Sequence, residues 1–561
     1  MRATVALYGI KDRSCQEYPC FVHDHNLCVM KDGKIIQYLQ LERLTRRKHD
    51  NRLDVFIEDL IDEGVVGLPD EFDLICVNDF VGSAFISKNG RLHFESDRPK
   101  QLIPSLIPAN AYLSDKTGWG GREIQSWACP HELAHVFTAI PFSGGLRENS
   151  LLVSLDGASS FGNYSAFLFR DEKLTLLENG WKDLGYVSKF FNDNKLAFKI
   201  LGISPKEHCS LPGKLMGFAS WGVWCQDIEE WLRDNEYFNC CGKYHGAEIL
   251  DSIKQRFGNV CKDFDTLNPF LQNCAATLQH IFAKAILDKL ERLQNKFHCD
   301  YLYYGGGCAL NIVTNSKIVE LGLFKEIFIA PCCDDSGLSI GAATFLEMQK
   351  GNNVALHSPY LCDVGLDRTN YQADDAEVAK TAELLMRHKI VGICNGMSEA
   401  GPRALGNRSL VALPDSKELS RHISMGIKKR EWYRPLAPIM LLDNARKTVE
   451  QDVVSISKYM LMDFRIKPDF REQMAGVVHA NGTARIQTIS CEEENPFMFR
   501  LLSYLYDRYG TIALINTSFN QQGEPIVHTH GQAMEATRRM KLDGVVINGV
   551  LNEGDVKNGL A

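Results

Sequence analysis

The sequence predicts an α/β protein in which one α/β unit occurs twice and a different α/β unit follows. The first copy starts with the apolar strand "ATVALYGI" and the hairpin "LCVMKDGKIIQYLQ", and the second with "LLVSLDGAS" and "YSAFLFRDEKLTLLE". In both copies a strand leads into a hairpin through turns that contain Asp-Gly or charged residues. The helix "DDAEVAKTAELLMRHK" and the strand "IVGICNG" then open the different unit.

A duplicated unit of this kind is typical of an actin-like ATPase, in which Asp-Gly turns from both halves hold nucleotide phosphates. The alternative interpretation is an α/β protein whose hairpins are unrelated. Apolar residues at helical spacing predict a long helix over residues 275–296. The next segment, "CDYLYYGGGCALN", is typical of a strand that passes through a glycine turn to a helix N-terminus, where backbone amides are exposed. A stretch without clear periodicity follows. We therefore expect the actin-like domain at residues 1–350, a linker at 351–374 and the second domain at 375–561.

Composition restricts the classes of function. The chain has 561 residues, of which 45% are hydrophobic and 24% charged, as in globular proteins with a large core. A net charge of −8 argues against a nucleic acid as the main partner. The 18 cysteines are scattered and include adjacent pairs, which is typical of reduced thiols in a cytoplasmic protein. Neither a signal peptide nor an apolar run of membrane-spanning length is present, so we expect a cytoplasmic location.

The segment "PHELAH" places His131 and His135 one helical turn apart, a spacing that lets two imidazoles bind one metal ion. With Glu132 it forms the H-E-x-x-H pattern of zinc proteases. A protease would need a third ligand soon afterwards, and only Glu148 is available in the next twenty residues. Asp156 and Asp335, each where a strand gives way to a glycine turn, are the alternative partners. Two buried helix histidines without a metal are a further interpretation.

Spacing alone does not separate Asp335 from its neighbour Asp334. A site of two histidines and two aspartates would suit iron, manganese or zinc. The glycine-rich segments "GGGCALN" and "PGKLMGFAS", together with the Asp-Gly turns, resemble a phosphate cradle in which Lys214 supplies a positive charge.

The second unit has four segments in which arginine or lysine occurs among glycine, proline and small polar residues. They are "SEAGPRALGNRSL", "IKKREWYRPLAP", "GTARIQTI" and "NTSFNQQGEPI". Guanidinium groups that converge from such loops bind phosphate or carboxylate through bidentate hydrogen bonds. A solvated charged surface is the alternative interpretation.

These four segments, with "HELAH" and "PGKLMGFA", resemble the O-carbamoyltransferases of antibiotic and nodulation-factor biosynthesis, of the tobramycin carbamoyltransferase type. The resemblance runs from "VHDHN" near residue 23 to "GEPIV" near residue 526. It implies an actin-like domain similar to the enzyme that transfers threonylcarbamoyl to tRNA, followed by a YrdC-like domain. The YrdC-like domain would convert carbamoyl phosphate and ATP into carbamoyl-adenylate with release of pyrophosphate. The actin-like domain would then transfer the carbamoyl group to a hydroxyl of a small-molecule natural product.

The resemblance also implies roles for individual residues. The implied metal ligands are His131, His135, Asp156 and Asp335, and His23 is the implied base that deprotonates the acceptor. The implied nucleotide-binding residues are Gly157, Gly213, Lys214, Gly306, Gly307 and Asn311. The residues implied to bind carbamoyl phosphate are Arg403, Lys428, Arg434, Arg485 and Asn516.

The implied metal is Fe²⁺, with Zn²⁺, Mn²⁺ or Mg²⁺ as alternatives, and ATP is a substrate. The partners are carbamoyl phosphate, ATP and a hydroxylated acceptor, without nucleic acid or membrane, and a homodimer is left open. Two residues depart from the family pattern: Glu132 stands where many relatives have a second histidine, and Phe21 where an acidic residue is usual. The resemblance therefore does not carry the acceptor over to this chain.

Two other hypotheses compete with an ATP-dependent O-carbamoyltransferase. A metalloprotease would explain the five residues 131–135 and leave the arginine-rich loops without a role. A catalytically inactive actin-like nucleotide-binding protein would leave the intact loops "GPRALG" and "NTSFN" unexplained. The carbamoyltransferase accounts for both parts of the chain.

Overall fold

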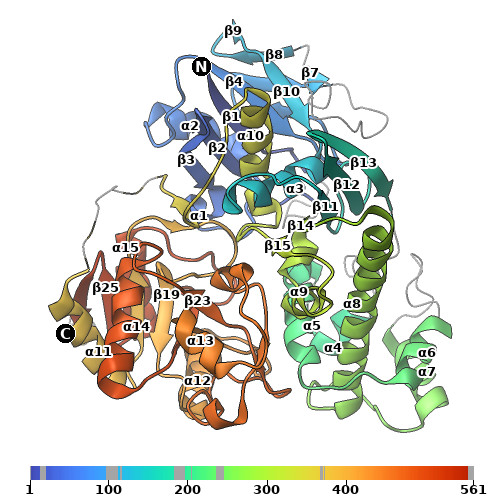
Figure 1. Cartoon of the computed structure of the whole chain (residues 1–561), viewed down its shortest axis with the longest axis vertical. Helices are drawn as coiled ribbons and strands as arrows, with labels where there is room; N and C mark the ends of the chain where they lie inside the picture. Colours follow the sequence, from blue (N-terminus) through green and yellow to red (C-terminus); the bar gives the residue numbers. More distant parts are fainter. Residues whose placement is uncertain are drawn as a thin grey trace.

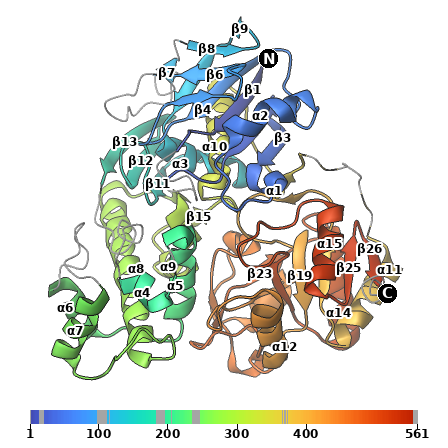
Figure 2. The ribbon, with the colours of Figure 1, turned by 180° about the vertical axis from the view of Figure 1, so that it is seen from behind.

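The fold is described from a computed structural model, shown in Figure 1. The described residues are 2–12, 21–96, 112–113, 116–181, 196–203, 205–234, 246–364, 366, 371 and 373–553. Figures 1 and 2 show three parts: the two N-terminal sheets at the top, a helical part below them, and the C-terminal α/β domain beside that helical part.

The first two sheets repeat one strand order. The first has the order β3-β2-β1-β4-β10-β7 and the second the order β13-β12-β11-β14-β15. In each, an antiparallel three-stranded meander is followed by a parallel neighbour, β4 beside β1 and β14 beside β11. The strands of the first sheet are β1 (Ala3–Tyr8), β2 (Asn26–Lys31), β3 (Lys34–Gln40), β4 (Phe72–Val77), β7 (Tyr112–Leu113) and β10 (Ser126–Cys129). Those of the second are β11 (Ser150–Leu155), β12 (Tyr164–Arg170), β13 (Lys173–Gly180), β14 (Tyr301–Gly305) and β15 (Glu326–Phe328).

This repetition confirms the predicted duplicated actin-like fold. Helices α3 (His131–Phe142) and α10 (Leu338–Gln349) contact each other between the two sheets. Their backbones approach closely at Gly341, where an added Cβ atom would lie 1.9 Å from the carbonyl oxygen of Ala134. Only glycine permits this approach, which brings the start of α10 next to the start of α3.

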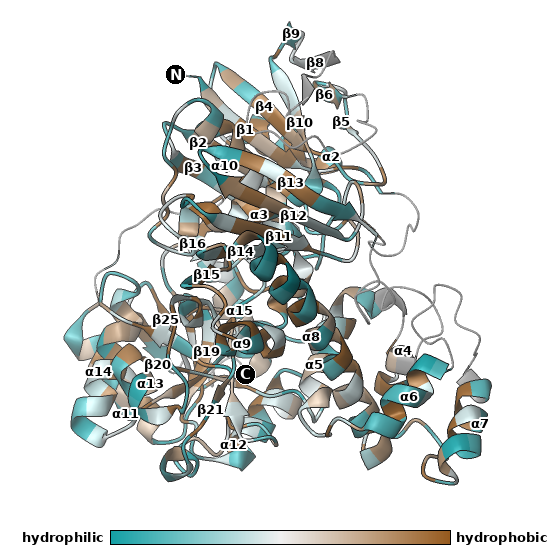
Figure 3. Ribbon diagram, turned by 45° about the vertical axis from the view of Figure 1, so that its right-hand side comes forward, coloured by the Kyte–Doolittle hydropathy of each residue, from teal (hydrophilic) through white to brown (hydrophobic). Residues whose placement is uncertain are grey.

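Both halves of the first domain contain further helices and strands. The first half also holds α1 (Leu41–Thr45), α2 (Leu53–Asp62) and the small sheet of β5 (Ala84–Ile86), β6 (Leu92–Glu95), β8 (Lys116–Trp119) and β9 (Arg122–Glu123). The second half holds α4 (Leu196–Leu201), η2 (Pro205–Ser210), α5 (Leu211–Ala219), α6 (Gln226–Asp234), α7 (Gly246–Phe257), α8 (Pro269–Phe297), η3 (Gly307–Leu310), α9 (Ile312–Glu320) and η4 (Asp335–Gly337). Figure 3 shows mostly apolar strands such as β4 and β12, and polar surfaces on α6 and α7.

The long helix predicted over 275–296 is α8, which begins earlier, at Pro269. The reason is a strong local start signal: the Asn268 side chain accepts a hydrogen bond from the backbone N–H of Phe270, and Pro269 occupies the first helical position. Apolar periodicity identifies the buried stripe of the helix and misses this polar first turn.

The C-terminal domain is a separate α/β domain, as the sequence predicts for the second unit. Its seven-stranded mixed sheet has the order β23-β20-β24-β19-β17-β25-β26. The strands are β17 (Val391–Cys394), β19 (Arg408–Ala412), β20 (Ala437–Leu441), β23 (Gln487–Ile489), β24 (Leu514–Ser518), β25 (Gly544–Ile547) and β26 (Val550–Glu553). The helices are α11 (Asp375–Met386), α12 (Lys417–Arg421), α13 (Leu442–Thr448), α14 (Pro496–Tyr509) and α15 (His530–Met540).

Among its described residues, the stretch expected to lack regular structure contains the short strand β16 (Tyr360–Cys362), which pairs with β18 (Ser398–Glu399). Three residues after a proline are too few to show an alternating pattern, so this strand could not be predicted from periodicity. The domains are joined by further contacts from α1 and the turn after it. Arg43 donates to the carbonyl oxygen of Gly401 (2.7 Å), and Arg46 to that of Ile526 (2.6 Å). No helix among the described residues is long and apolar enough to cross a membrane.

Candidate active site

The first turn of α3 carries two buried imidazoles that face each other. Pro130 precedes the helix as its N-cap, and the backbone N–H of His131 donates to the hydroxyl of Ser160 (3.0 Å). The Nε2 atoms of His131 and His135 lie 2.9 Å apart. Two ring nitrogens this close need a hydrogen atom or a metal ion between them, because their lone pairs would otherwise repel each other.

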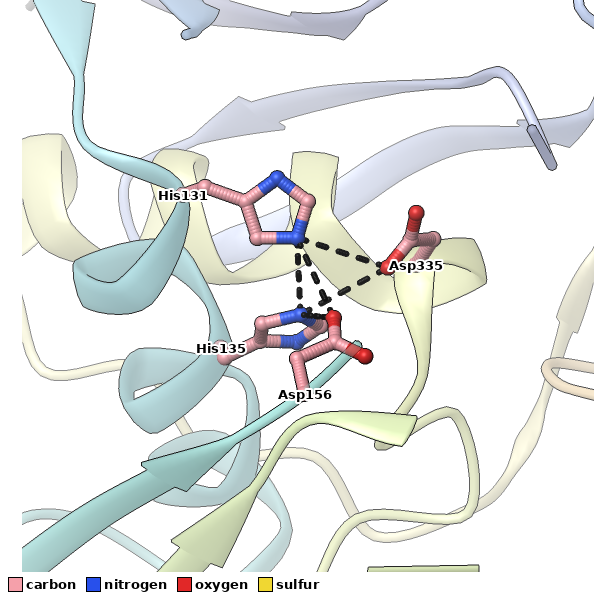
Figure 4. A group of neighbouring side chains, drawn as sticks. All are labelled: His131, His135, Asp156 and Asp335. Atoms are coloured by element: carbon pink, nitrogen blue, oxygen red, sulfur yellow. Dashed lines mark hydrogen bonds and ion pairs between the residues drawn. The ribbon is translucent and has the colours of Figure 1, made fainter. Parts of the chain in front are cut away.

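Two carboxylates complete this group, as Figure 4 shows. Asp156 follows β11, and its Oδ2 lies 2.8 Å from Nε2 of His135. Asp335 begins η4, and its Oδ1 lies 3.4 Å from Nε2 of His131 and 3.5 Å from Nε2 of His135. One ligand atom from each of the four residues falls within 4.8 Å of every other. The structure therefore brings together the four residues for which the sequence predicts metal binding.

The neighbouring Asp334 takes another role. Its Oδ1 accepts hydrogen bonds from the backbone N–H and the hydroxyl of Ser336 and so caps η4. Asp335 is the one that reaches the histidines, which resolves the choice that spacing left open.

The remaining polar atoms of the four residues fit a metal site. The Nδ1 of His131 lies 3.1 Å from the carboxylate of Asp79, and Tyr8 donates its hydroxyl proton to Oδ2 of Asp335 (3.0 Å). Backbone N–H groups of Gly157 and Gly307 donate to Oδ1 of Asp156, at 2.6 and 3.3 Å. Such outer contacts hold ligand atoms in place around a central ion. Two imidazoles and two carboxylates are a donor set that suits Fe²⁺, Zn²⁺ or Mn²⁺.

Charge within the group also favours a cation. Burial acts to lower the pKa of His131, but the carboxylates of Asp335, Asp156 and Asp79 together outweigh it and hold this pKa well above its usual value. The carboxylates thus create a strongly negative environment at the two imidazoles, as a divalent ion requires.

Glu132 does not point at the histidine pair. Its Oε1 accepts a hydrogen bond from the backbone N–H of Phe161 (2.6 Å), and burial raises the pKa of the carboxyl group. Glu148, the third ligand that a protease would have needed, accepts from the backbone N–H groups of Asp171 and Glu172 instead. The arrangement lacks the geometry of an H-E-x-x-H protease, because the glutamate is not placed to activate a metal-bound water.

The glycine turns adjoin this group. Gly306 has φ of 92°, and an added Cβ would lie 2.0 Å from the carbonyl oxygen of Leu155, so the turn before η3 packs against the strand that leads to Asp156. Asn311 caps α9 by accepting from the backbone N–H of Thr314 (3.1 Å), and its amide also bonds Gln279. Gly157, Gly306 and Gly307 therefore line the metal-ligand group, whereas Asn311 is engaged in a helix cap next to it.

Lys214 and Gly213 lie on α5, where Lys214 contacts both domains. The ammonium of Lys214 lies 2.8 Å from a carboxylate oxygen of Glu207 and 2.8 Å from one of Glu431 in the second domain. Gly213 lies in the first turns of the same helix with open space beside it. A nucleotide contact for these two residues stays a prediction.

His23 lies beside the metal-ligand group, with Nδ1 3.7 Å from Oδ2 of Asp335. The same Nδ1 is 2.8 Å from Oδ2 of Asp24, and Nδ1 of His49 is 2.9 Å from that oxygen. Asp24 and His49 have φ of 57° and 56°, an uncommon conformation for residues other than glycine that recurs at functional sites. Asp24 and His49 were not predicted as site residues, although both stand next to other histidine or aspartate residues in "HDH" and "KHD".

The second domain gathers the predicted cations into one group. Arg403, Arg434 and Arg485 lie close enough to interact electrostatically. The Nε atoms of Arg403 and Arg485 are buried and have no hydrogen-bond partner within the described part of the chain. The Oδ1 of Asn516 is also buried without a hydrogen-bond partner among the described residues, and the amide nitrogen of the same side chain donates to Gln487 (2.6 Å). Buried charged donors without partners indicate a site for a ligand that the donors would bind.

Lys428 is partly committed to the protein itself. Its ammonium donates to Ser518 and to the carbonyl and side-chain oxygens of Asn520, at 2.8 and 3.0 Å. The sequence analysis did not select Arg430 or Lys48. Burial, followed by the neighbouring guanidinium groups of Arg434 and Arg485, lowers the pKa of Arg430 well below its usual value. Lys48, from the first domain, adds a further cation beside Arg430 and Arg434. We name Arg403, Lys428, Arg430, Arg434 and Arg485 the arginine group.

The arginine group and the metal-ligand group are neighbours. Arg403 interacts with Cys333 and Asp334, which directly precede Asp335. Gly401, two residues before Arg403, packs so closely on the same turn that an added Cβ would lie 2.4 Å from the carbonyl oxygen of Pro331. The loop that positions the arginine thus rests on the turn that supplies a metal ligand.

A group of two histidines and two aspartates lies next to buried cationic donors that have no partner among the described residues, an arrangement that suits an enzyme with an anionic substrate. Comparison with known proteins specifies the class. The family models described as Carbamoyltransferase N-terminus and Carbamoyltransferase C-terminus match residues 120–344 and 382–553. The chain belongs to the carbamoyltransferase family and is an enzyme that transfers carbamoyl groups.

Full-length relatives agree with the family models. Nodulation protein U of Rhizobium tropici is 34% identical over 578 residues, which cover 94% of each chain. Nodulation protein NolNO of Sinorhizobium fredii is 28% identical and covers 95% of this chain and 79% of the relative. Among solved structures, T. kodakarensis HypF is similar over 63% of this chain and 48% of its own, with 12% identity and a TM-score of 0.33.

Proposed function

We propose that the chain is an ATP-dependent O-carbamoyltransferase that acts in two steps. In the first, carbamoyl phosphate is hydrolysed to carbamate and phosphate, and a carbamate oxygen attacks the α-phosphorus of ATP. The products are carbamoyl-adenylate and pyrophosphate. In the second, a hydroxyl of a small-molecule acceptor attacks the carbamoyl carbon, and AMP leaves. Residues 375–561 are assigned to the first step, residues 1–350 to the second, and residues 351–374 connect them.

The observation that carries this proposal is the arginine group, in which the buried Nε atoms of Arg403 and Arg485 have no partner among the described residues and which lies beside the turn that supplies Asp335. Arg403, Arg434 and Arg485 would bind the phosphoryl oxygens of carbamoyl phosphate and stabilise the charge on the departing phosphate. Asn516, with its free Oδ1, is suited to accept a hydrogen bond from the carbamoyl NH₂. Lys428 would add charge while it holds the loop at Asn520.

In the first domain, His131, His135, Asp156 and Asp335 would hold a divalent ion, for which we favour Fe²⁺ over Zn²⁺, Mn²⁺ or Mg²⁺. When bound, the ion would supply positive charge for the oxygens of the carbamoyl nucleotide. Gly157, Gly306 and Gly307 would let the nucleotide approach the backbone closely beside the ion, while their own N–H groups hold Asp156 and the carbonyl oxygen of Cys333. Gly213, Lys214 and Asn311 are kept as nucleotide-binding proposals at the periphery.

His23 is the proposed base in the transfer step. Asp24 contacts its Nδ1 and so orients the ring, and His23 would take the proton of the acceptor hydroxyl. The transfer then proceeds as follows: the proton moves to His23, the new carbon–oxygen bond forms, and the bond to the adenylate oxygen breaks. Because the arginine group lies next to the metal-ligand group, carbamoyl-adenylate would move only a short distance from the first step to the second.

The Arg434→Ala variant tests the proposal. Without an acceptor, the wild-type chain should release pyrophosphate from ATP only when carbamoyl phosphate is present, and the variant should lose roughly 100-fold of this rate. Arg446→Ala is the matched control, since Arg446 is exposed on α13 and pairs with the exposed Asp443. Undiminished pyrophosphate release by Arg434→Ala would refute the assignment of the second domain.

A further inference from the structure

Three aromatic rings form an exposed cluster at the edge of the first domain. Phe21 and Trp181 have 49% and 61% of their surface exposed, and Phe80 lies between them. The ring centres of Phe21 and Phe80 are 5.4 Å apart, and those of Phe80 and Trp181 are 6.3 Å apart, with both pairs nearly perpendicular. Scattered apolar residues are normal on a surface, but three large rings gathered in contact indicate a binding surface. We name Phe21, Phe80 and Trp181 the aromatic platform.

Each ring is tied to a different component of the candidate active site. Phe21 precedes His23 by two positions, and Phe80 directly follows Asp79, whose carboxylate lies 3.1 Å from His131. Trp181 directly follows β13, where the carbonyl oxygen of Gly180 accepts from the backbone N–H of Asn163 (3.3 Å). Asn163 in turn accepts from the backbone N–H of Asp156 (3.0 Å). The platform is therefore continuous with the site through three separate segments.

The carboxylates next to the platform are already bound. Asp12 accepts the backbone N–H groups of Phe21 (2.7 Å) and Val22 (3.2 Å) with one oxygen. One carboxylate oxygen of Asp24 lies within hydrogen-bond distance of the imidazoles of both His23 and His49. In the part of the chain that the structure describes, these nearby acids already serve protein donors, so they offer little to an ammonium group on a ligand. The flat apolar surfaces of the three rings are what is available for recognition.

We propose that the aromatic platform binds the acceptor, and that the acceptor is an uncharged alcohol with a flat apolar ring face, either a sugar or a carbocyclic compound. This inference rests on the proposed function and specifies its second substrate. The C–H face of the ring would pack against the indole and phenyl faces, as aromatic side chains do with other apolar rings. One hydroxyl would then point towards His23, to which its proton passes while its oxygen joins the carbamoyl carbon and AMP is released.

The test combines an acceptor panel with variants of the platform. The panel contains methyl β-glucoside as the neutral sugar, cyclohexylmethanol as the carbocyclic alcohol, glycerol as an alcohol without a ring, and an amino sugar with several ammonium groups. The variants are Trp181→Ala, Phe80→Ala and the conservative Trp181→Phe. Trp224→Ala is the matched control, because Trp224 is similarly exposed (48%) but stacks on His280, near the start of α6. Carbamoyl transfer is followed by mass spectrometry, and ring-alcohol binding by ligand-observed saturation-transfer NMR.

The expected result is a difference between acceptors and between kinetic constants. In the wild-type chain the two uncharged ring alcohols should be better acceptors than glycerol or the amino sugar. Trp181→Ala and Phe80→Ala should raise KM for the ring alcohols by roughly tenfold with kcat little changed, which corresponds to the loss of one ring contact. Trp181→Phe should restore most of the affinity, and Trp224→Ala should behave as wild type.

Several outcomes would overturn the platform without affecting the proposed function. One is an unchanged KM in the Trp181→Ala and Phe80→Ala variants, and another is a preference for the amino sugar. If no panel member is carbamoylated, equal NMR saturation transfer to the ring alcohols from wild type and Trp181→Ala would overturn it too. A failure of the proposed function is seen separately, as the absence of carbamoyl-phosphate-dependent pyrophosphate release from the wild-type chain.

Discussion

Asp334 and Asp335, which are adjacent in the turn before α10, have different roles. Asp335 reaches the two histidines, while Asp334 caps η4. Asp335→Asn should therefore weaken binding of a divalent ion by roughly 100-fold or more, because loss of even an outer partner of a metal ligand costs 10- to 100-fold. Asp334→Asn is the matched control and should keep its affinity close to that of wild type. Both are measured by competition with a metal chelator. Equal affinities for the two variants would contradict this assignment of the ligands.

At the level of single residues, the sequence predicted what local spacing determines. His131 and His135 were predictable because residues four apart share a helix face. The choice between Asp334 and Asp335 was not, because it depends on φ and ψ at one turn. The role of Glu132 was also hidden: the residue contacts the backbone of Phe161, almost thirty positions away, and no local pattern encodes that contact.

At the level of elements, the crossing of α3 and α10 places the ligands. Gly341 allows it, and Gly341→Ala would put a methyl group 1.9 Å from the carbonyl oxygen of Ala134. The clash is with a backbone carbonyl group, which cannot rotate aside as the end of a side chain can, so α10 must move away from α3. We expect a loss of about 2 kcal/mol of stability and weaker metal binding, because Asp335 moves with α10.

Chemical denaturation and the chelator assay measure these two effects. Gly531→Ala is the control for a glycine-to-alanine change in a helix, since its nearest contact for an added Cβ is the Thr529 hydroxyl at 3.9 Å. It should leave both properties near wild type. A Gly341→Ala variant with wild-type stability and metal affinity would show that the helices tolerate separation.

Helices and strands were predictable where short-range sequence patterns determine them. Both strand-and-hairpin units are seen in the sequence because Asp-Gly turns and apolar strands are short-range signals. The start of α8 at Asn268 and Pro269 lies outside its apolar stripe, and β16 is too short to have a period. Both were therefore missed or misplaced.

At the level of the whole molecule, the two domains share their functional groups across an interface that sequence order does not reveal. Lys48 lies beside Arg430 and Arg434, almost four hundred positions further along the chain. Arg46 binds the carbonyl oxygen of Ile526. Composition identified the arginine-rich loops, but which cations converge depends on how the domains dock. Periodicity and spacing contain no information about that docking.

Lys214 provides a test of this interface. Its buried ammonium lies between Glu207 and, across the interface, Glu431 of the second domain. If this ion pair is the main role of Lys214, then Lys214→Met removes the cation that Glu207 and Glu431 share and should cost about 1 kcal/mol of stability, because both carboxylates are partly exposed to water. Lys214→Met with Glu431→Gln removes both charges of the interdomain pair and should recover part of that loss, a coupling that a double-mutant cycle measures.

The competing role of Lys214, contact with the nucleotide, predicts a different pattern. In that case Lys214→Met weakens ATP binding, and Glu431→Gln does not restore it. The interdomain role instead predicts a lower thermal midpoint with ATP affinity near wild type, measured by calorimetry at a temperature where both variants are folded.

Because the Glu431 carboxylate also lies 3.6 Å from Arg434, freeing it from Lys214 should strengthen its interaction with that arginine and slow pyrophosphate release. Glu431→Gln in the Lys214→Met background removes this competing carboxylate. Recovery of both stability and pyrophosphate release in the double variant would therefore connect the interface to the chemistry of the arginine group.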